Sequence, residues 1–136
     1  MSRIAIITDT DASLPADLMA RYNIAQVPIS VQFGAEIIER DIDIDNATLF
    51  ARIDRENKLP TTSAPPPGKF AQAYQAAIDG GAESIVCLTV SSEVSASYNA
   101  ACVAGDMFPD NDITVVDSRM LAMGQGFMVL AAAEAA

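Results

Sequence analysis

Hydrophobic and polar positions along this 136-residue chain divide it into two kinds of segment. Four apolar runs have strand character, and all but the second are continuous, which is typical of parallel strands covered on both faces. These runs are Ile4–Thr8, Ile24–Phe33, Ser84–Val90 and Ile113–Asp117. Helical patterns separate and follow them, at Leu14–Tyr22, Asn46–Asn57, Gly68–Asp79, Val94–Met107 and the Ala-rich stretch from Ala122.

Strands that alternate with helices predict an α/β fold. We expect a three-layer α/β/α arrangement around a mostly parallel sheet. Gly34 is expected to turn the second strand back through Glu36–Glu39, as a hairpin that adds an edge ladder to that sheet. The length supports a single domain over residues 1–136. The Ala-rich end carries no capping residue, which favours a chain cut from a longer protein.

Charge and composition narrow the possible functions. Lys and Arg number 8 against 18 Asp and Glu, and the basic residues are scattered, so nucleic acid and anionic membrane surfaces are not expected partners. Histidine is absent, which removes Ser-His-Asp and Cys-His triads and the HExxH zinc site. No signal-peptide pattern and no apolar stretch of about 20 residues is present, so we expect a cytoplasmic protein without a membrane span.

The two cysteines are too far apart in sequence for a CxxC redox or zinc pair. Cys87 lies inside the third apolar run and is expected to be a small buried thiol. The acidic run 41–45 fails as a calcium loop, because Asn46 and Arg52 occupy the positions that need Gly and Glu. Asp45 is instead predicted to be the N-cap or a first-turn acid of the helix that begins at Asn46.

Polar residues follow the strands, where ligands bind in open α/β sheets. Hydroxyls are more numerous there than helix capping requires, since residues 91–97 alone hold four serines. A second hydroxyl-rich loop, residues 60–67, precedes a predicted helix and is stiffened by its prolines. Hydroxyls and free N–H groups at two helix N-termini predict a site for a carboxylate or a phosphate. We expect the Asp9 and Asp117 carboxylates to accept backbone N–H bonds from neighbouring loops and so hold these hydroxyls.

An alternative follows from Asp9-Thr10-Asp11-Ala12-Ser13, which resembles the nucleophile motif of haloacid-dehalogenase-type phosphatases. That resemblance implies Asp9 as the nucleophile, Asp11 as the acid/base and Mg²⁺ held by carboxylates. Neither Lys58 nor Lys69 follows a predicted strand, so a convincing phosphate-binding lysine is missing.

Five segments in order and at matching spacing resemble DegV-family fatty-acid-binding proteins, over essentially the whole chain. They are Ile7-Thr8-Asp9-Thr10 with Leu14-Pro15, Val27-Pro28-Ile29-Ser30-Val31, Thr61-Thr62-Ser63-Ala64-Pro65, Ser91-Ser92-Glu93-Val94-Ser95-Ala96-Ser97-Tyr98 and Val116-Asp117-Ser118. Ala96 departs from the usual glycine, and Ala64 and Asp11 also depart from the common residues. The resemblance corresponds to the N-terminal domain of a family whose members usually have two domains, so it implies that the second domain is absent or truncated here.

The resemblance implies a non-catalytic carrier that needs no cofactor and binds a long-chain fatty acid. It also implies a separate ATP-dependent fatty-acid kinase as a partner, which makes acyl-phosphate for phospholipid synthesis. A groove left exposed without a second domain makes a homodimer a further expectation. The residues expected to bind the carboxylate are the hydroxyls Thr61, Thr62, Ser63, Ser91, Ser92 and Ser95.

Overall fold

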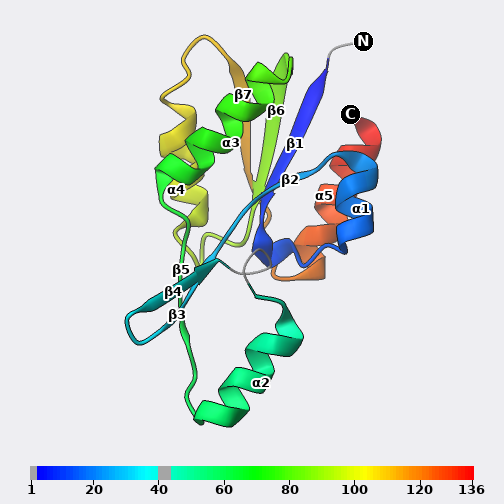
Figure 1. Cartoon of the computed structure of the whole chain (residues 1–136). Coiled ribbons are helices and arrows are strands. Elements are labelled where there is room, and N and C mark those ends of the chain that lie inside the picture. Colours follow the sequence, from blue (N-terminus) through cyan, green and yellow to red (C-terminus); the bar gives the residue numbers. More distant parts are fainter. Residues whose placement is uncertain (1–2, 40–43) are drawn as a thin grey trace.

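A computed structural model describes residues 3–39 and 44–136 of the chain, so Asp41 and Asp43 of the rejected calcium motif lie outside the described residues. Figure 1 shows how the helices and strands are arranged. The strands are β1 (Ile4–Asp9), β2 (Ala25–Val27), β3 (Ser30–Phe33), β4 (Glu36–Glu39), β5 (Thr61–Ser63), β6 (Ser84–Thr89) and β7 (Asp112–Asp117). The helices are the 3-10 turn η1 (Thr10–Ala12), α1 (Ala16–Tyr22), α2 (Asn46–Glu56), α3 (Pro67–Asp79), α4 (Ser97–Gly105) and α5 (Met123–Ala135).

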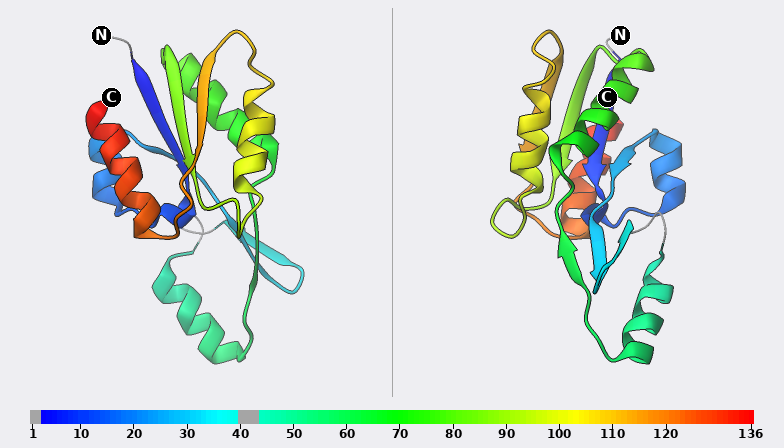
Figure 2. Two further views of the ribbon diagram at one scale, coloured as in Figure 1. Left: turned by 180° about the vertical axis from the view of Figure 1, so that it is seen from behind. Right: turned by 60° about the vertical axis from the view of Figure 1, so that its left-hand side comes forward.

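The main sheet is a four-stranded parallel sheet with strand order β2-β1-β6-β7. Helices α3 and α4 cover one face, and α1 and α5 cover the other, as Figure 2 shows from two sides. The predicted three-layer α/β/α architecture is therefore confirmed. No helix in the described part of the chain has the length and apolar character that a bilayer crossing requires.

Successive side chains of a strand point to opposite faces of the main sheet, so the core is divided into two clusters, one on each face. Ile7 and Cys87 pack beneath Phe70 and Tyr74 of α3, whereas Ile6 belongs to the cluster beneath α5. Cys87 is fully buried, as predicted, and burial raises the pKa of its thiol to about 12. Helices cover both faces of the central strands, which explains why the sequences of these strands are continuously apolar.

A second, three-stranded antiparallel sheet corrects two predictions. The apolar run Ile24–Phe33 is not one strand, because it breaks at Pro28 into β2 of the main sheet and β3 of the second sheet. The hairpin at Gly34 is confirmed, with a φ of +63° at that glycine. Its strands pair in the order β4-β3-β5 and add no ladder to the main sheet.

Helix α2 packs on the second sheet rather than on the main one. Leu49 and Ile53 contact a small cluster made by Val31, Phe33, Ile38 and Ile44. Asp45 caps this helix as predicted, since its Oδ1 accepts the Thr48 N–H at 2.7 Å. No residue of α2 is fully buried, so the helix depends on this satellite cluster for its position.

Candidate functional site

The carboxyl ends of β1 and β6 mark the point where the strand order reverses. From β1 the chain crosses to β2, and from β6 it crosses the other way to β7. The connections therefore leave on opposite faces, α1 on one and α4 on the other (Figure 2). In open α/β sheets a ligand crevice lies at such a switch point. The hydroxyl segment Ser91–Ser97 begins here, directly after β6 and Val90.

Asp9 ends β1 and ties two loops to it. Its Oδ2 accepts the Val90 N–H at 2.8 Å, and its Oδ1 accepts the Asp11 N–H at 3.1 Å. The side chain is completely buried, and this burial raises its pKa, although the hydrogen bonds from Val90, Gln125 and Asp11 oppose the rise. The prediction that this carboxylate accepts backbone N–H bonds from neighbouring loops is confirmed. Because Val90 precedes Ser91, Asp9 fixes where the serine segment starts.

Gln125 completes the Asp9 site and was missed in the sequence. Its Nε2 donates to Thr8 Oγ1 at 2.9 Å and to Asp9 Oδ1 at 3.0 Å, and the side chain is fully buried. These bonds dock α5 against the end of β1. A lone amide inside the small and apolar run of α5 was the available signal, because buried amides require hydrogen-bond partners.

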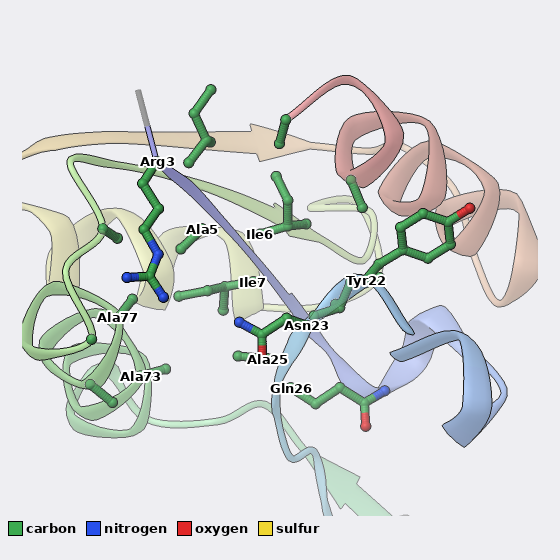
Figure 3. A pocket seen from close by; sticks show the side chains of 17 residues that line it. Arg3, Ala5, Ile6, Ile7, Tyr22, Asn23, Ala25, Gln26, Ala73 and Ala77 are labelled. Carbon is green, nitrogen blue, oxygen red and sulfur yellow. The ribbon is translucent and has the colours of Figure 1, made fainter. Parts of the chain in front are cut away.

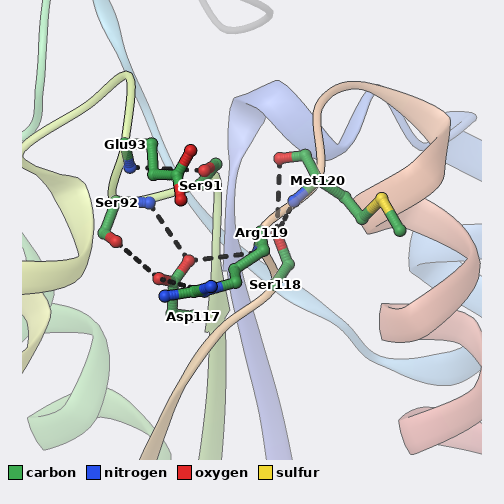
Figure 4. Close-up of polar contacts among 7 residues, drawn as sticks. All are labelled: Ser91, Ser92, Glu93, Asp117, Ser118, Arg119 and Met120. Atoms are coloured by element: carbon green, nitrogen blue, oxygen red, sulfur yellow. Dashed lines mark hydrogen bonds and ion pairs between the residues drawn. The ribbon is translucent and has the colours of Figure 1, made fainter.

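At the end of β7, the Asp117 carboxylate also accepts hydrogen bonds from neighbouring loops (Figure 4). Its Oδ1 accepts the N–H groups of Ser92 and Arg119, both at 3.1 Å. Its Oδ2 accepts the Ser92 hydroxyl at 2.5 Å. The Ser92 hydrogen bond holds the pKa of Asp117 below its usual value. The predicted role of Asp117 as a backbone acceptor is therefore confirmed, and Ser92 is its main partner.

The remaining serines of the segment bond among themselves and to nearby backbone. Ser91 is nearly buried; its N–H donates to Met120 O at 3.0 Å and its Oγ accepts the Glu93 N–H at 3.3 Å. Ser95 is half-buried, and its Oγ accepts the Ser97 N–H at 3.2 Å. Residues 92–94 form a turn, so α4 begins at Ser97 and the prediction of a helix from Val94 was wrong. Ser92 is thus the most accessible of the three predicted serines.

The second set of predicted hydroxyl residues, Thr61–Ser63, belongs to a strand and not to a loop. Thr61, Thr62 and Ser63 form β5, which pairs with β3, and all three are exposed. Thr62 pairs with Val31 and lies on the α2-covered face, whereas Thr61 and Ser63 lie on the opposite face. Helix α3 begins at Pro67, one residue before the predicted start, but residues 64–66 separate it from β5, so these hydroxyls do not stand at its N-terminus as expected.

Both sets of hydroxyl residues, the serine segment and β5, are nevertheless held by hydrogen bonds to the same end of β1. Asp9 holds Val90, which leads into Ser91. The next residue, Thr10, accepts the Ile29 N–H on its Oγ1 at 3.0 Å, and Ile29 leads into Ser30, the β-sheet partner of Ser63. Figures 1 and 2 show β5 and the segment after β6 at this end of the main sheet. The consecutive residues Asp9 and Thr10 therefore anchor both groups.

The geometry does not suit the phosphatase alternative. The Asp9 carboxylate is fully buried and accepts three N–H groups, so it has no open path to a phosphate. The Oδ2 of Asp11 accepts the Ala122 N–H at 3.0 Å. Within residues 3–39 and 44–136, no group of three or more acidic or Cys side chains is arranged to hold a metal ion.

Exposed apolar side chains border the serine segment, and we call Val94, Met120 and Leu121 the apolar rim. Their exposed fractions are 65%, 50% and 56%, which is high for side chains of this size. Val94 donates its N–H to Ser91 O at 3.2 Å, and Met120 O accepts from Ser91 N. The backbone of Ser91 therefore links the serine segment to two residues of the apolar rim, and exposed apolar side chains lie near its hydroxyls. This arrangement fits an amphipathic ligand.

A separate cavity lies away from the serine segment. It has a volume of about 500 Å³ and opens beside the first half of β1, where β2 diverges from it. Figure 3 shows Arg3, Tyr22, Asn23 and Gln26 around apolar side chains of β1 and α3. None of the six predicted hydroxyl residues lines this cavity.

Comparison with known proteins gives consistent matches. A family model described as an uncharacterised protein of the DegV family matches residues 3–136. A DegV domain-containing protein of Streptomyces coelicolor is 41% identical over 137 residues, which cover 100% of this chain and 48% of that protein. The chain spans about half the length of the curated relatives it matches.

Solved structures agree with the fold. A fatty-acid-binding DegV family protein from Thermus thermophilus superposes with a TM-score of 0.87 and 34% identity, covering 97% of this chain and 46% of that one. A stearic-acid-binding protein from Eubacterium ventriosum gives a TM-score of 0.89 and 26% identity, covering 98% of this chain and 47% of that one.

Proposed function

This chain belongs to the DegV family, and from that premise we propose that it binds a long-chain fatty acid as a non-catalytic carrier. The observation that carries the proposal is that exposed apolar side chains lie beside the serine segment at the switch point. The exposed β5 hydroxyls can donate hydrogen bonds to a carboxylate, and Ser92 can do so in competition with Asp117. The apolar rim offers a surface to the acyl chain. The similar proteins from Thermus thermophilus and Eubacterium ventriosum are described as binding fatty acid and stearic acid.

The expected binding free energies of the acyl chain and the head group differ in size. Burial of an acyl chain with about fourteen methylenes gains roughly 11 kcal/mol before ordering costs. Each hydrogen bond to a charged head group adds only about 1.5–3 kcal/mol. The tail therefore supplies most of the affinity, and the hydroxyls select the head group.

We also propose that residues 1–136 correspond to the N-terminal α/β domain of a two-domain lipid-binding protein. The half-length match to the relatives supports this proposal. The site residues proposed for the carboxylate are Thr61, Thr62, Ser63, Ser91, Ser92 and Ser95. A fatty-acid kinase as the recipient of the bound acid, and a homodimer, are further proposals that the family resemblance and the exposed apolar rim suggest.

Native mass spectrometry of the purified protein, with solvent extraction of the same sample, is the first test. A co-purifying mass equal to that of a fatty acid is the expected result, and its value gives the chain length. If no fatty acid co-purifies and none binds after addition, the proposal is wrong.

A double variant then locates the head group. Thr62→Ala with Ser92→Ala should leave the circular dichroism spectrum unchanged and weaken fatty-acid binding at least about tenfold, the equivalent of one lost bond to a charged group. Thr114→Ala, an exposed hydroxyl on β7, is the matched control. Because Thr61 and Ser63 lie on the other face of β5, replacing them together shows which face meets the ligand. Unchanged affinity in both double variants would refute the head-group assignment.

A further inference from the structure

The two hydrogen-bond donors of Ser92 are already in use. Its N–H bonds to Asp117 Oδ1 at 3.1 Å, and its hydroxyl bonds to Asp117 Oδ2 at 2.5 Å. Ser92 itself is exposed, and the side chain of Asp117 beneath it is 17% exposed. A ligand that approaches Ser92 Oγ therefore meets lone pairs rather than a proton.

The charge on Asp117 adds to this effect. The hydrogen bonds from Ser92 stabilise the ionised carboxylate and lower its pKa. Arg119 is the adjacent cation, but its Nε lies 3.9 Å from Asp117 Oδ2 and its side chain is 74% exposed, so water screens it. A ligand carboxylate in contact with Ser92 Oγ would lie within about 5 Å of the Asp117 carboxylate, because Oγ is 2.5 Å from Asp117 Oδ2 and the contact with the ligand adds about 2.5–2.9 Å.

We infer that Asp117 is a specificity-determining residue of the head-group site, which competes with the ligand for the Ser92 hydroxyl proton. The inference rests on the proposed function and names its selectivity: the site favours a head group that donates a hydrogen bond to Ser92 Oγ over an ionised carboxylate. Two like charges about 5 Å apart lower affinity by a factor of about four in water, and by more at a partly buried site. Asp117 thereby holds the affinity for an ionised fatty acid below what the hydroxyls alone allow, which suits a carrier that must release its ligand.

Asp117→Asn isolates this role because the bonds to backbone can remain. The amide oxygen can still accept the N–H groups of Ser92 and Arg119, which both bond to Oδ1. The amide nitrogen replaces Oδ2 and can only donate, so it bonds to Ser92 Oγ and releases the hydroxyl proton to the ligand. This substitution therefore removes the charge of Asp117 and frees the Ser92 hydroxyl proton, while the hydrogen bonds from the Ser92 and Arg119 N–H groups can remain.

The experiment is isothermal titration calorimetry with oleic acid and oleyl alcohol, which share a tail and differ in head-group charge. We expect Asp117→Asn to bind the acid at least about tenfold more tightly than the wild type, with about fourfold from loss of the like charge and the rest from the freed Ser92 donor. The affinity for the alcohol should change less than about twofold. Asp110→Asn is the matched control, because it removes one exposed charge from the loop before the opposite end of β7 and should change neither affinity. Adding Ser92→Ala to Asp117→Asn should reduce the gain to the roughly fourfold effect of removing the charge.

The outcomes separate this inference from the proposed function. Equal or weaker acid binding by folded Asp117→Asn, or an equal change for acid and alcohol, overturns the inference and leaves fatty-acid binding intact. If neither ligand binds any folded variant, the proposed function fails and the inference fails with it. A gain in acid affinity that Ser92→Ala leaves undiminished also overturns the inference, because competition for the Ser92 proton would then contribute nothing to it.

Discussion

Replacing one of two glycines of α5 by alanine should lower the free energy of unfolding, whereas replacing the other should not. Gly126 packs against η1, and a Cβ added there would lie 2.6 Å from the backbone oxygen of Ala12 and 3.0 Å from the Met123 Sδ. Both distances are well inside van der Waals contact. Gly124 is exposed, and its added Cβ would meet the Met120 Cβ at 3.3 Å, where a half-exposed neighbour can shift. The same substitution therefore tests whether α5 is held against η1.

The magnitudes follow from helix propensity and packing. Replacing a helical glycine by alanine gains about 0.5–1 kcal/mol in either position. At Gly126 this gain opposes an overpacking cost of about 1–3 kcal/mol, at the upper end because a backbone oxygen cannot rotate away. We expect Gly126→Ala to lower the free energy of unfolding by about 1–2 kcal/mol. Gly124→Ala should leave it unchanged or raise it by up to about 1 kcal/mol.

Urea unfolding followed by far-UV circular dichroism measures the difference, since the chain has no tryptophan to report by fluorescence. Both variants change one hydrogen atom to a methyl group in one helix, so each is the control for the other. If Gly126→Ala is as stable as Gly124→Ala, α5 does not pack against η1 as described. The Gln125 bonds to Asp9 and Thr8 would then be in doubt as well, because Gln125 is the preceding residue.

Two further predictions concern single carboxylates. Burial raises the pKa of Asp9 above 3.8, so its contribution to stability is present at low pH and is lost as the pH rises through the raised pKa. Relative to Asp9→Asn, which does not titrate, the wild type should gain stability as the pH falls from about 7 to about 4 in urea titrations; a constant difference contradicts this. Asp45→Ala removes the bond to Thr48 N–H and should cost about 1 kcal/mol within α2. Hydrogen exchange of the α2 amides should accelerate while main-sheet amides stay protected, and unchanged α2 exchange would be the contrary result.

Local patterns in the sequence predicted three of the four strands of the main sheet to within one residue at each end. The continuous apolar runs that correspond to β1, β6 and β7 can be recognised because strands covered on both faces need apolar side chains on both faces. Asp45 as a helix cap and Cys87 as a buried thiol are equally local inferences, and both are confirmed. The family resemblance added the hydroxyls of the proposed head-group site, and the structure places both groups at one end of the sheet.

Contacts between distant residues decided the rest. β5 contains only hydroxyl residues, and it is a strand because β3 offers an unpaired edge, which no local pattern reveals. The chain leaves the main sheet at Pro28, and a hydrogen bond from Ile29 N–H to Thr10, 19 residues away, holds it where it enters the second sheet.

The same holds at the candidate site. Gln125 is buried as an amide because Asp9 and Thr8, 116 and 117 residues away, accept its hydrogens. Ser92 faces a carboxylate rather than free solvent because β7 brings Asp117 beneath it, 25 residues later. The amino-acid sequence by itself thus determined which segments are buried and which carry hydroxyls, since burial and polarity are properties of single residues. Only the tertiary structure decided which donors are already taken, because a hydrogen bond depends on the positions of both partners.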